Sequence, residues 1–231
     1  MFRFRINFIR VVVFGYFLGA GAHWVYAQNG FYQLAVLKYR GGGDWYANPT
    51  AVRNLQAFCN DELGMGLSDE VATVEVGSTD LFDYPWIHMT GHGNVVFSAS
   101  EARNLRIYLE AGGFLHISDN YGMDAFVRRE MNKVLQNADW QEVPWTHPVF
   151  HSAYDLDQGL PKVHEHDDRP PQGLGLFLKG RLVVFYDYES DLSDGWEDYQ
   201  VHRDPEEIRQ LALQMGANLV THAFRGAIGS D

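Results

Sequence analysis

The segment "GGFLHISDNYGMD", residues 112–124, decides how the rest of the chain is interpreted. Residues 114–117 are mostly large and apolar, which predicts a buried strand. Three polar residues, Ser118, Asp119 and Asn120, follow directly. They supply more polar groups than a single helix cap needs. We therefore consider two roles for Asp119: a helix cap, or a nucleophile or general base exposed at the tip of a sheet.

The chain around this segment alternates between strand and helix patterns. Strands are predicted over residues 31–39, 71–76, 86–90, 114–118 and 181–188. Helices are predicted after the pair Asn48–Pro49, after the capping box of Ser98 and Glu101, over 123–135, and after Asp204–Glu207. Residues 140–175 hold most of the prolines and are predicted to form long, ordered loops. This alternation is typical of a three-layer α/β fold, in which helices cover both faces of a mostly parallel sheet.

The N-terminal segment has the features of an export signal. Arginines open it, and residues 11–22 are apolar but short for a membrane span. Small residues then precede a cleavage position after Ala27. We expect residues 1–27 to be a signal peptide and residues 28–231 to be a single α/β domain. The expected location is the periplasm or the cell exterior, without stable membrane insertion after cleavage; the alternative is an uncleaved anchor.

Charge and cysteine content exclude several classes of partner and site. The chain has 30 acidic and 18 basic residues, for a formal net charge of −12. Such a surface repels phosphate backbones and anionic lipids, so nucleic acids and membrane surfaces are not expected partners. Cys59 is the only cysteine, which excludes an intrachain disulfide. Its helical spacing with Val52, Leu55 and Leu63 predicts a small buried hydrophobe rather than a reactive thiol.

A common edge of the predicted sheet collects the candidate ligand-binding residues. In mostly parallel sheets, ligands bind beyond the carboxyl ends of the strands. The segments that follow predicted strands are 41–46, 91–94, 118–121 and 187–191. The residues predicted to bind a ligand are Gly41, Gly42, Gly43, Asp44, Trp45, Gly91, Gly93, Asn120, Asp187 and Glu189. The glycine run resembles an anion-binding loop in position only, because it matches no dinucleotide or P-loop motif. Trp45 suits a sugar ring, another flat apolar face or a simple surface turn.

The histidines near this edge receive different interpretations. Glycines flank His92, so the backbone there could approach a ligand closely and offer N–H groups to an oxyanion. His88 lies on the preceding strand, where its spacing from His92 carries no implication for zinc. We expect His88 and His116 to be hydrogen-bonded histidines of the core or its boundary.

Two polar clusters follow later in the chain. They are "KVHEHDD", residues 162–168, and "DYESDLSDGWED", residues 187–198. Either could hold a hard cation or, through histidine, a transition metal. The second lacks the glycine and spacing of an EF-hand loop. The default expectation is a solvated acidic face. No cofactor is predicted, and a divalent metal ion is the alternative.

Four motifs carry a resemblance to a known family. They are "LAVLKYRGGGDWYANP", "IHMTGHGNVVFS", "GGFLHISDNYGMD" and "VHRDPEE". They resemble the exported bacterial family called domain of unknown function 4159, over nearly all of the chain after residue 27. The resemblance implies a flavodoxin-like fold similar to class I glutamine amidotransferases and the trehalose-utilisation (ThuA-like) proteins. It implies no activity.

The wider superfamily suggests roles for individual residues. The resemblance places Asp119 where the amidotransferases carry their nucleophilic cysteine, so thiolate-dependent glutaminase chemistry is not expected. The segment 90–93 resembles the loop that forms their oxyanion hole. The stretch "YQVHRDPEE" resembles their Gln-x-His-Pro-Glu segment and would bring His202, and with it Glu206, near Asp119. Two additional residues interrupt this last match.

These observations leave two main hypotheses. One is a cell-envelope enzyme that acts on a carbohydrate or similar polar substrate, with Asp119 as nucleophile or acid/base and His202 or His92 as its proton partner. The other is a non-catalytic module that binds a ligand or a protein on a flat aromatic surface. The aromatic candidates for that surface are Trp45, Tyr46, Trp145 and Trp196. Metal-dependent hydrolysis, which rests only on the abundance of histidine and acids, is a third.

Overall fold

The computed structural model describes residues 32–228. The predicted signal peptide, residues 1–27, lies outside the described residues. Between residues 32 and 228, no helix is long and apolar enough to cross a membrane.

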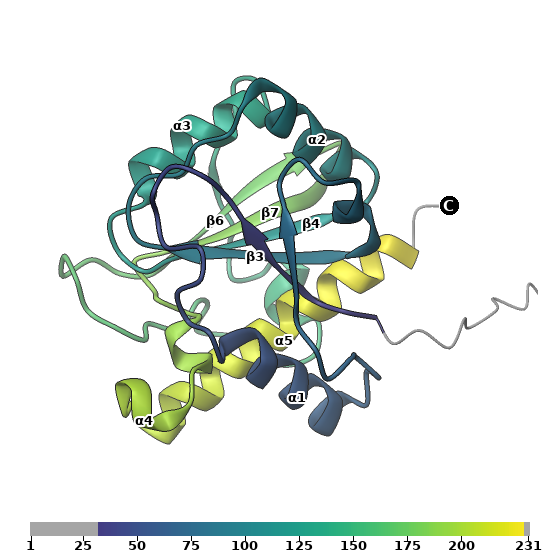
Figure 1. Ribbon diagram of the computed structural model, residues 1–231. Coiled ribbons are helices and arrows are strands. Elements are labelled where there is room, and N and C mark those ends of the chain that lie inside the picture. The colour runs from purple at the N-terminus through teal and green to yellow at the C-terminus, as the bar shows by residue number, and fades with distance from the viewer. Residues whose placement is uncertain (1–31, 229–231) are drawn as a thin grey trace, which may run out of the picture. The chain divides into compact units, whose positions relative to one another are not determined.

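Seven strands form one sheet in the described part of the chain (Figure 1). They are β1 (Ala35–Lys38), β2 (Ala72–Glu75), β3 (Trp86–Gly91), β4 (Phe114–Asp119), β5 (Gln141–Glu142), β6 (Gln172–Leu178) and β7 (Arg181–Tyr188). Their order is β2-β1-β3-β4-β7-β6-β5. The first five strands in this order pair in parallel, whereas β6 and β5 are antiparallel additions beside β7. The predicted α/β class with a mostly parallel sheet is confirmed.

Helices cover both faces of this sheet, as predicted. They are α1 (Ala51–Leu63), α2 (Ala99–Glu110), α3 (Asp124–Val134), α4 (Tyr199–His202) and α5 (Glu206–Ile228), with short 3-10 helices at Thr79–Asp83, Pro148–His151 and Asp194–Trp196. Figure 1 shows α2 and α3 on one face and α1 and α5 on the other. Each face has its own hydrophobic core. The strands between them are buried on both sides, which explains the continuous apolar runs of β3 and β4.

The antiparallel part of the sheet differs from the sequence-based expectation. Residues 140–175 were expected to be loops, yet they contain β5 and the first residues of β6. Two glycines of β6 are needed for close packing between strands. A Cβ on Gly173 would lie 2.8 Å from the ring of Phe185, and one on Gly175 would lie 2.6 Å from Leu182. Glycine is therefore required at these two positions, because large neighbouring side chains occupy the space that a Cβ would need.

The start of α1 is a second correction. The pair Asn48–Pro49 was expected to cap the helix, but the N-cap residue is Thr50, and no side chain of its own caps the helix. The carboxylate of Glu197 does so instead, because its Oε1 accepts the backbone N–H groups of Thr50 and Ala51, each at 2.9 Å. Asn48 has a left-handed backbone, with φ of 58°, and its side chain points to other partners. The helix is thus capped by a distant segment rather than by its own sequence.

Other local predictions are confirmed. The capping box of Ser98 and Glu101 forms at the start of α2. Cys59 is a buried free cysteine, and burial raises the pKa of its thiol to about 12. This thiol is therefore protonated and packed as a small hydrophobe.

Candidate functional site

The carboxyl ends of β1, β3, β4 and β7 meet at one edge of the sheet, which we call the carboxyl edge. In the strand register, Gly91 of β3 lies beside Asp119 of β4. Asn120, just beyond β4, connects the neighbouring segments: its Oδ1 accepts from Thr90 Oγ1 at 2.9 Å, and its Nδ2 donates to Asn48 Oδ1 at 2.9 Å. The segments that follow the parallel strands are therefore joined by side-chain hydrogen bonds.

Asp119 lies at this edge in a largely buried position, with 4% of its surface exposed. Its Oδ1 accepts the backbone N–H of Met123 at 3.1 Å, and its Oδ2 accepts the hydroxyl of Tyr186 at 2.9 Å. Burial raises the pKa of the Asp119 carboxyl, and the carboxylates of Asp124 and Asp191 raise it further. The hydrogen bonds from Met123 and Tyr186 oppose this rise in the pKa. Through the bond from Met123, Asp119 supports the start of the segment that leads into α3.

A cavity of about 340 Å³, the Asp119 pocket, opens beside this carboxyl. Its lining is formed by Asp119, Tyr121, Gly122, Asp124, Ala125, His166, Asp167, Tyr188 and Glu189. The ring of Tyr121 stacks on His166 with 4.5 Å between centroids, and its hydroxyl donates to Asp167 at 3.1 Å. The lining therefore combines carboxylates with exposed aromatic faces.

A buried polar chain runs behind the carboxyl edge. His88 Nδ1 and His116 Nδ1 are 3.1 Å apart, and His116 Nε2 is 2.8 Å from Asp187 Oδ2. The expectation that both histidines belong to the core is confirmed, since each is almost fully buried. Burial lowers the pKa of His88 to about 3 and raises the pKa of Asp187. Asp187, predicted as a ligand-binding residue, is fully buried and also accepts from Ser118 Oγ at 3.0 Å.

The glycine-rich segments of the edge pack against each other. Gly43 N donates to Asn94 O at 3.0 Å, and a Cβ on Gly43 would lie 2.8 Å from that oxygen. His92 is exposed, and its Nδ1 is 3.0 Å from Asp44 Oδ2. The two predicted loops therefore meet, through the close approach of backbones that glycine permits. Ligand binding by Gly41, Gly42, Gly91 and Gly93 stays a prediction.

The predicted aromatic surface does not form as expected. Trp196 is fully buried, and its indole N–H donates to Ala212 O at 2.8 Å. Tyr46 and Trp145 are exposed. Trp45 and Tyr46 line a separate cavity of about 240 Å³ beside α1. A flat surface that includes Trp196 is excluded, because this residue packs beneath α5.

The two polar clusters of the sequence meet, together with residues 202–204, in one place, which we call the histidine–carboxylate cluster. Its members are His164, His166, His202, Asp191, Asp194 and Asp204. The expectation of a solvated acidic face is wrong for residues 187–197, where Asp187, Glu189, Asp191, Asp194 and Glu197 are buried. The segment runs between α1 and α5, and apolar Leu192 and Trp196 anchor it in the core.

His164 is the centre of this cluster. Its Nδ1 is 3.0 Å from Asp194 Oδ2 and 3.4 Å from Asp191 Oδ2, and its Nε2 is 3.0 Å from Asp204 Oδ1. Hydrogen bonds to Asp191 and Asp194 raise the pKa of His164 to about 10. The imidazole therefore faces carboxylates through both ring nitrogens.

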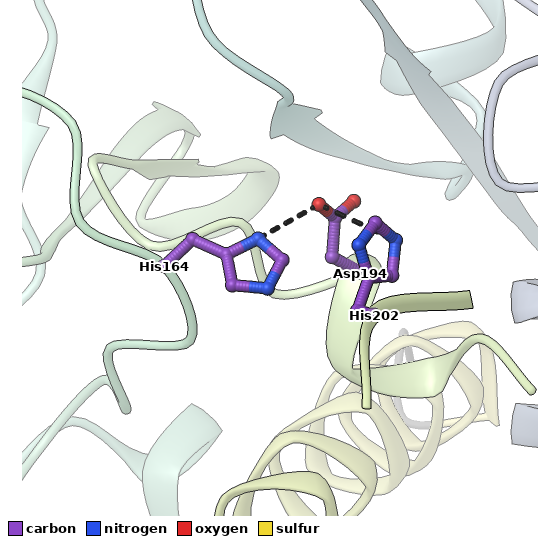
Figure 2. Close-up of side chains that lie close together, drawn as sticks. All are labelled: His164, Asp194 and His202. Atoms are coloured by element: carbon purple, nitrogen blue, oxygen red, sulfur yellow. Dashed lines mark ion pairs between the residues drawn. The ribbon is translucent and has the colours of Figure 1, made fainter. Parts of the chain in front are cut away.

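His202, a predicted catalytic residue, belongs to this cluster. Its Nε2 is 3.7 Å from Asp194 Oδ2, and its ring centroid is 4.9 Å from that of His164 (Figure 2). Among the described residues, Asp119 has hydrogen bonds with Met123 and Tyr186 and none with a histidine. The structure thus groups His202 with Asp194 and His164, His92 with Asp44, and Asp119 with the pocket.

Sequence reasoning did not link His164, Asp194 and Asp204. The clusters that contain His164 and Asp194 were each considered as metal-binding candidates, whereas Asp204 lies outside both, and nothing in the spacing of the three residues indicated contact. Backbone conformation gives a further signal that the sequence does not show. Non-glycine residues with left-handed φ near this edge are Asn48, Tyr121, Glu189, Asp191 and Arg203. Such conformations are uncommon and concentrate at functional sites.

Comparisons with known proteins place the chain in a family. Curated proteins give no match. The family model described as Domain of unknown function (DUF4159) matches residues 33–224. This range contains the sheet, the Asp119 pocket and the histidine–carboxylate cluster. The chain therefore belongs to the family described as Domain of unknown function (DUF4159).

Proposed function

We propose that the protein is an exported cell-envelope protein that binds a carbohydrate or similar polar molecule in the Asp119 pocket and acts on it through Asp119. The observation that carries the proposal is the position of a buried carboxyl, whose pKa is raised by burial, in the lining of a cavity of about 340 Å³ at the carboxyl edge. Ligands of open α/β sheets bind at this edge. The proposal includes the relation to the amidotransferase-like superfamily, without its cysteine nucleophile, and it requires no cofactor.

The lining of the pocket limits the class of ligand. Asp124, Asp167 and Glu189 surround the cavity together with Asp119. Carboxylates repel phosphates and other anions, and they accept hydrogen bonds from hydroxyl and ammonium groups. The half-exposed ring of Tyr121 offers a flat face beside them. A neutral sugar or an amino sugar satisfies both features.

Asp119 is suited to general acid catalysis. A carboxyl with a raised pKa stays protonated closer to neutral pH and can donate its proton to a leaving group. His166 lines the same pocket and also contacts Asp191, whereas His202 and His92 are not part of the pocket lining and contact Asp194 and Asp44. In this proposal, Asp119 therefore exchanges its proton with the ligand itself or with a group that lies near His166.

Ligand-dependent thermal stabilisation tests this proposal. The panel contains neutral sugars, amino sugars, cell-wall fragments and sugar phosphates, with the purified protein, Asp119→Asn and Glu189→Gln. Asp69→Asn is the matched control, because this exposed residue precedes β2 at the opposite edge. A ligand at 100 times its Kd should raise the melting temperature by about 5–10 °C.

We expect stabilisation by a neutral or amino sugar, loss of that stabilisation in both pocket variants, and retention in Asp69→Asn. Sugar phosphates should have no effect. If a ligand stabilises all four proteins equally, the pocket is not its site. If no member of the panel stabilises the protein, the proposed ligand class is wrong.

A non-catalytic binding module is the second candidate. It is favoured by the hydrogen bonds that already engage both carboxyl oxygens of Asp119. This alternative predicts that a stabilising sugar is recovered unchanged after prolonged incubation with the protein. Chemical conversion of the ligand that stops in Asp119→Asn would exclude it.

A further inference from the structure

We propose that His164, Asp194 and His202 form a binding site for a divalent transition-metal ion such as Zn²⁺. One ligand atom from each residue lies within 4.8 Å of the others. Figure 2 shows the two imidazoles on either side of the Asp194 carboxylate, both directed toward its Oδ2. The three residues come from different segments, namely the loop before β6, the 3-10 helix after β7 and α4.

Neighbouring residues orient these donors as the outer shell of a metal site does. Asp204 Oδ1 is 3.0 Å from His164 Nε2, so the Nδ1 of this imidazole remains the inward atom. A carboxylate on the far nitrogen of a histidine ligand is typical of zinc sites. Asn48 Nδ2 donates to Asp194 Oδ1 at 2.6 Å, which leaves Oδ2 facing the histidines.

An independent observation at the same place is the carboxylate of Asp191. It contacts His164 and His166 through Oδ2, whereas its Oδ1 has no hydrogen-bond partner among the described residues. Only 1% of Asp191 is exposed. A buried carboxylate oxygen without a partner is costly, and a cation or a water molecule bound to it would satisfy this oxygen.

The donor set selects the class of metal. Two imidazole nitrogens and one carboxylate oxygen suit Zn²⁺ and related transition metals, whereas Ca²⁺ and Mg²⁺ prefer oxygen donors alone. Three protein donors leave coordination positions for water or a substrate. The negative charges of Asp191, Asp194 and Asp204 around His164 attract a dication. This inference goes beyond the proposed sugar site, since none of the three donors lines the Asp119 pocket.

Zinc titration of the purified protein tests the site directly. The protein is prepared without a polyhistidine tag and treated with a chelator, and Zn²⁺ binding is then measured by isothermal titration calorimetry. His202→Ala is the main variant, because His202 is exposed and its contact with Asp194 is 3.7 Å, so its removal should not unfold the chain. Asp194→Asn removes the charged donor. Asp204→Asn tests the orientation of His164.

His151→Ala is the matched control, because His151 Nδ1 is 3.1 Å from Asp155 Oδ1 in a histidine–carboxylate pair away from the cluster. Circular dichroism verifies that each variant is folded.

We expect one Zn²⁺ per chain, at least a 10-fold weaker affinity in His202→Ala and Asp194→Asn, and about a 10- to 100-fold weaker affinity in Asp204→Asn. His151→Ala should bind like the unmodified protein, and Mg²⁺ should not compete. The inference is overturned if no Zn²⁺ binds, or if His202→Ala and Asp194→Asn keep the original stoichiometry and affinity, which would indicate an adventitious ion only. Neither result bears on sugar binding by the Asp119 pocket.

Discussion

The side-chain amide of Asn48 donates a hydrogen bond of 2.6 Å to the carboxylate of Asp194, across 146 residues of sequence. The same amide donates to Ser193 Oγ at 2.8 Å. One asparagine therefore joins the segment after β1 to the segment after β7. Its left-handed φ of 58° is a conformation that asparagine tolerates better than most residues.

Asn48→Ala should destabilise the protein by about 2–4 kcal/mol. The substitution removes the hydrogen bonds to Asp194 and Ser193. It also places alanine, whose Cβ is strained in the left-handed region, at positive φ. Asn48→Gly loses the same hydrogen bonds without the backbone strain. It should therefore be about 1 kcal/mol more stable than Asn48→Ala. Urea unfolding of the two variants measures the difference, and equal midpoints would contradict the assigned strain.

Removal of the Glu197 carboxylate should weaken the start of α1. This buried side chain accepts the N–H groups of Thr50 and Ala51 and the hydroxyl of Thr50, each at 2.9 Å. Glu197→Ala should lower the free energy of unfolding by about 2–4 kcal/mol. Glu197→Gln keeps one carbonyl oxygen as acceptor and should lose about half as much. Guanidinium unfolding monitored by circular dichroism distinguishes them, and a harmless Glu197→Ala would refute the cap.

Acid should destabilise the fold through His88. Burial lowers the pKa of His88 to about 3 in the folded protein, whereas the unfolded chain takes up this proton near pH 6.5. The contribution of His88 to the free energy of unfolding is therefore fully present above pH 6.5. It is lost as the pH falls from 6.5 toward 3, by up to about 1.4 kcal/mol per pH unit. The raised pKa values of Asp119 and Asp187 act in the opposite direction.

His88→Gln isolates this effect, because the variant keeps those carboxyls. The free energy of unfolding, measured in urea between pH 7.5 and 5, should fall less steeply in His88→Gln than in the unmodified protein. Parallel curves would show that His88 does not control the acid sensitivity.

Gly216→Ala should destabilise α5, although alanine is the better helix former. The helix preference favours alanine by about 1 kcal/mol. The new Cβ, however, would lie 2.7 Å from Leu55 and 2.7 Å from the ring of Trp196. Overpacking of this kind costs about 1–3 kcal/mol, so we expect a net loss. A higher melting temperature in Gly216→Ala would show that the core relaxes around the methyl group.

The fold could be predicted from the sequence more completely than the site, because many of its signals are local. Apolar runs such as residues 114–117 and the capping box at Ser98 are local signals, and the corresponding elements are present. The start of β6 could not be predicted, because its glycines do not indicate a strand. Gly173 and Gly175 are required by large side chains of the neighbouring strand, which is a non-local requirement.

The histidine–carboxylate cluster could not be predicted from the sequence for a similar, non-local reason. Residues 162–168 and 187–198, which supply four of its six members, were both recognisable as polar and potentially metal-binding. Their contact depends on the path of residues 189–197, which includes left-handed conformations at Glu189 and Asp191. Residue type suggests neither conformation, because each is maintained by the packing around it.

The Glu197 cap has a consequence for the order in which the molecule assembles. A chain that leaves the ribosome from its N-terminus presents α1 long before residue 197, so this helix starts with unsatisfied N–H groups until almost the whole domain is available. Completion of the carboxyl edge therefore coincides with completion of the domain. A fragment that ends before residue 197 retains the strands β1 to β7 but lacks the closure that holds α1, and it should be a preferred target for proteases and chaperones rather than a partly active protein.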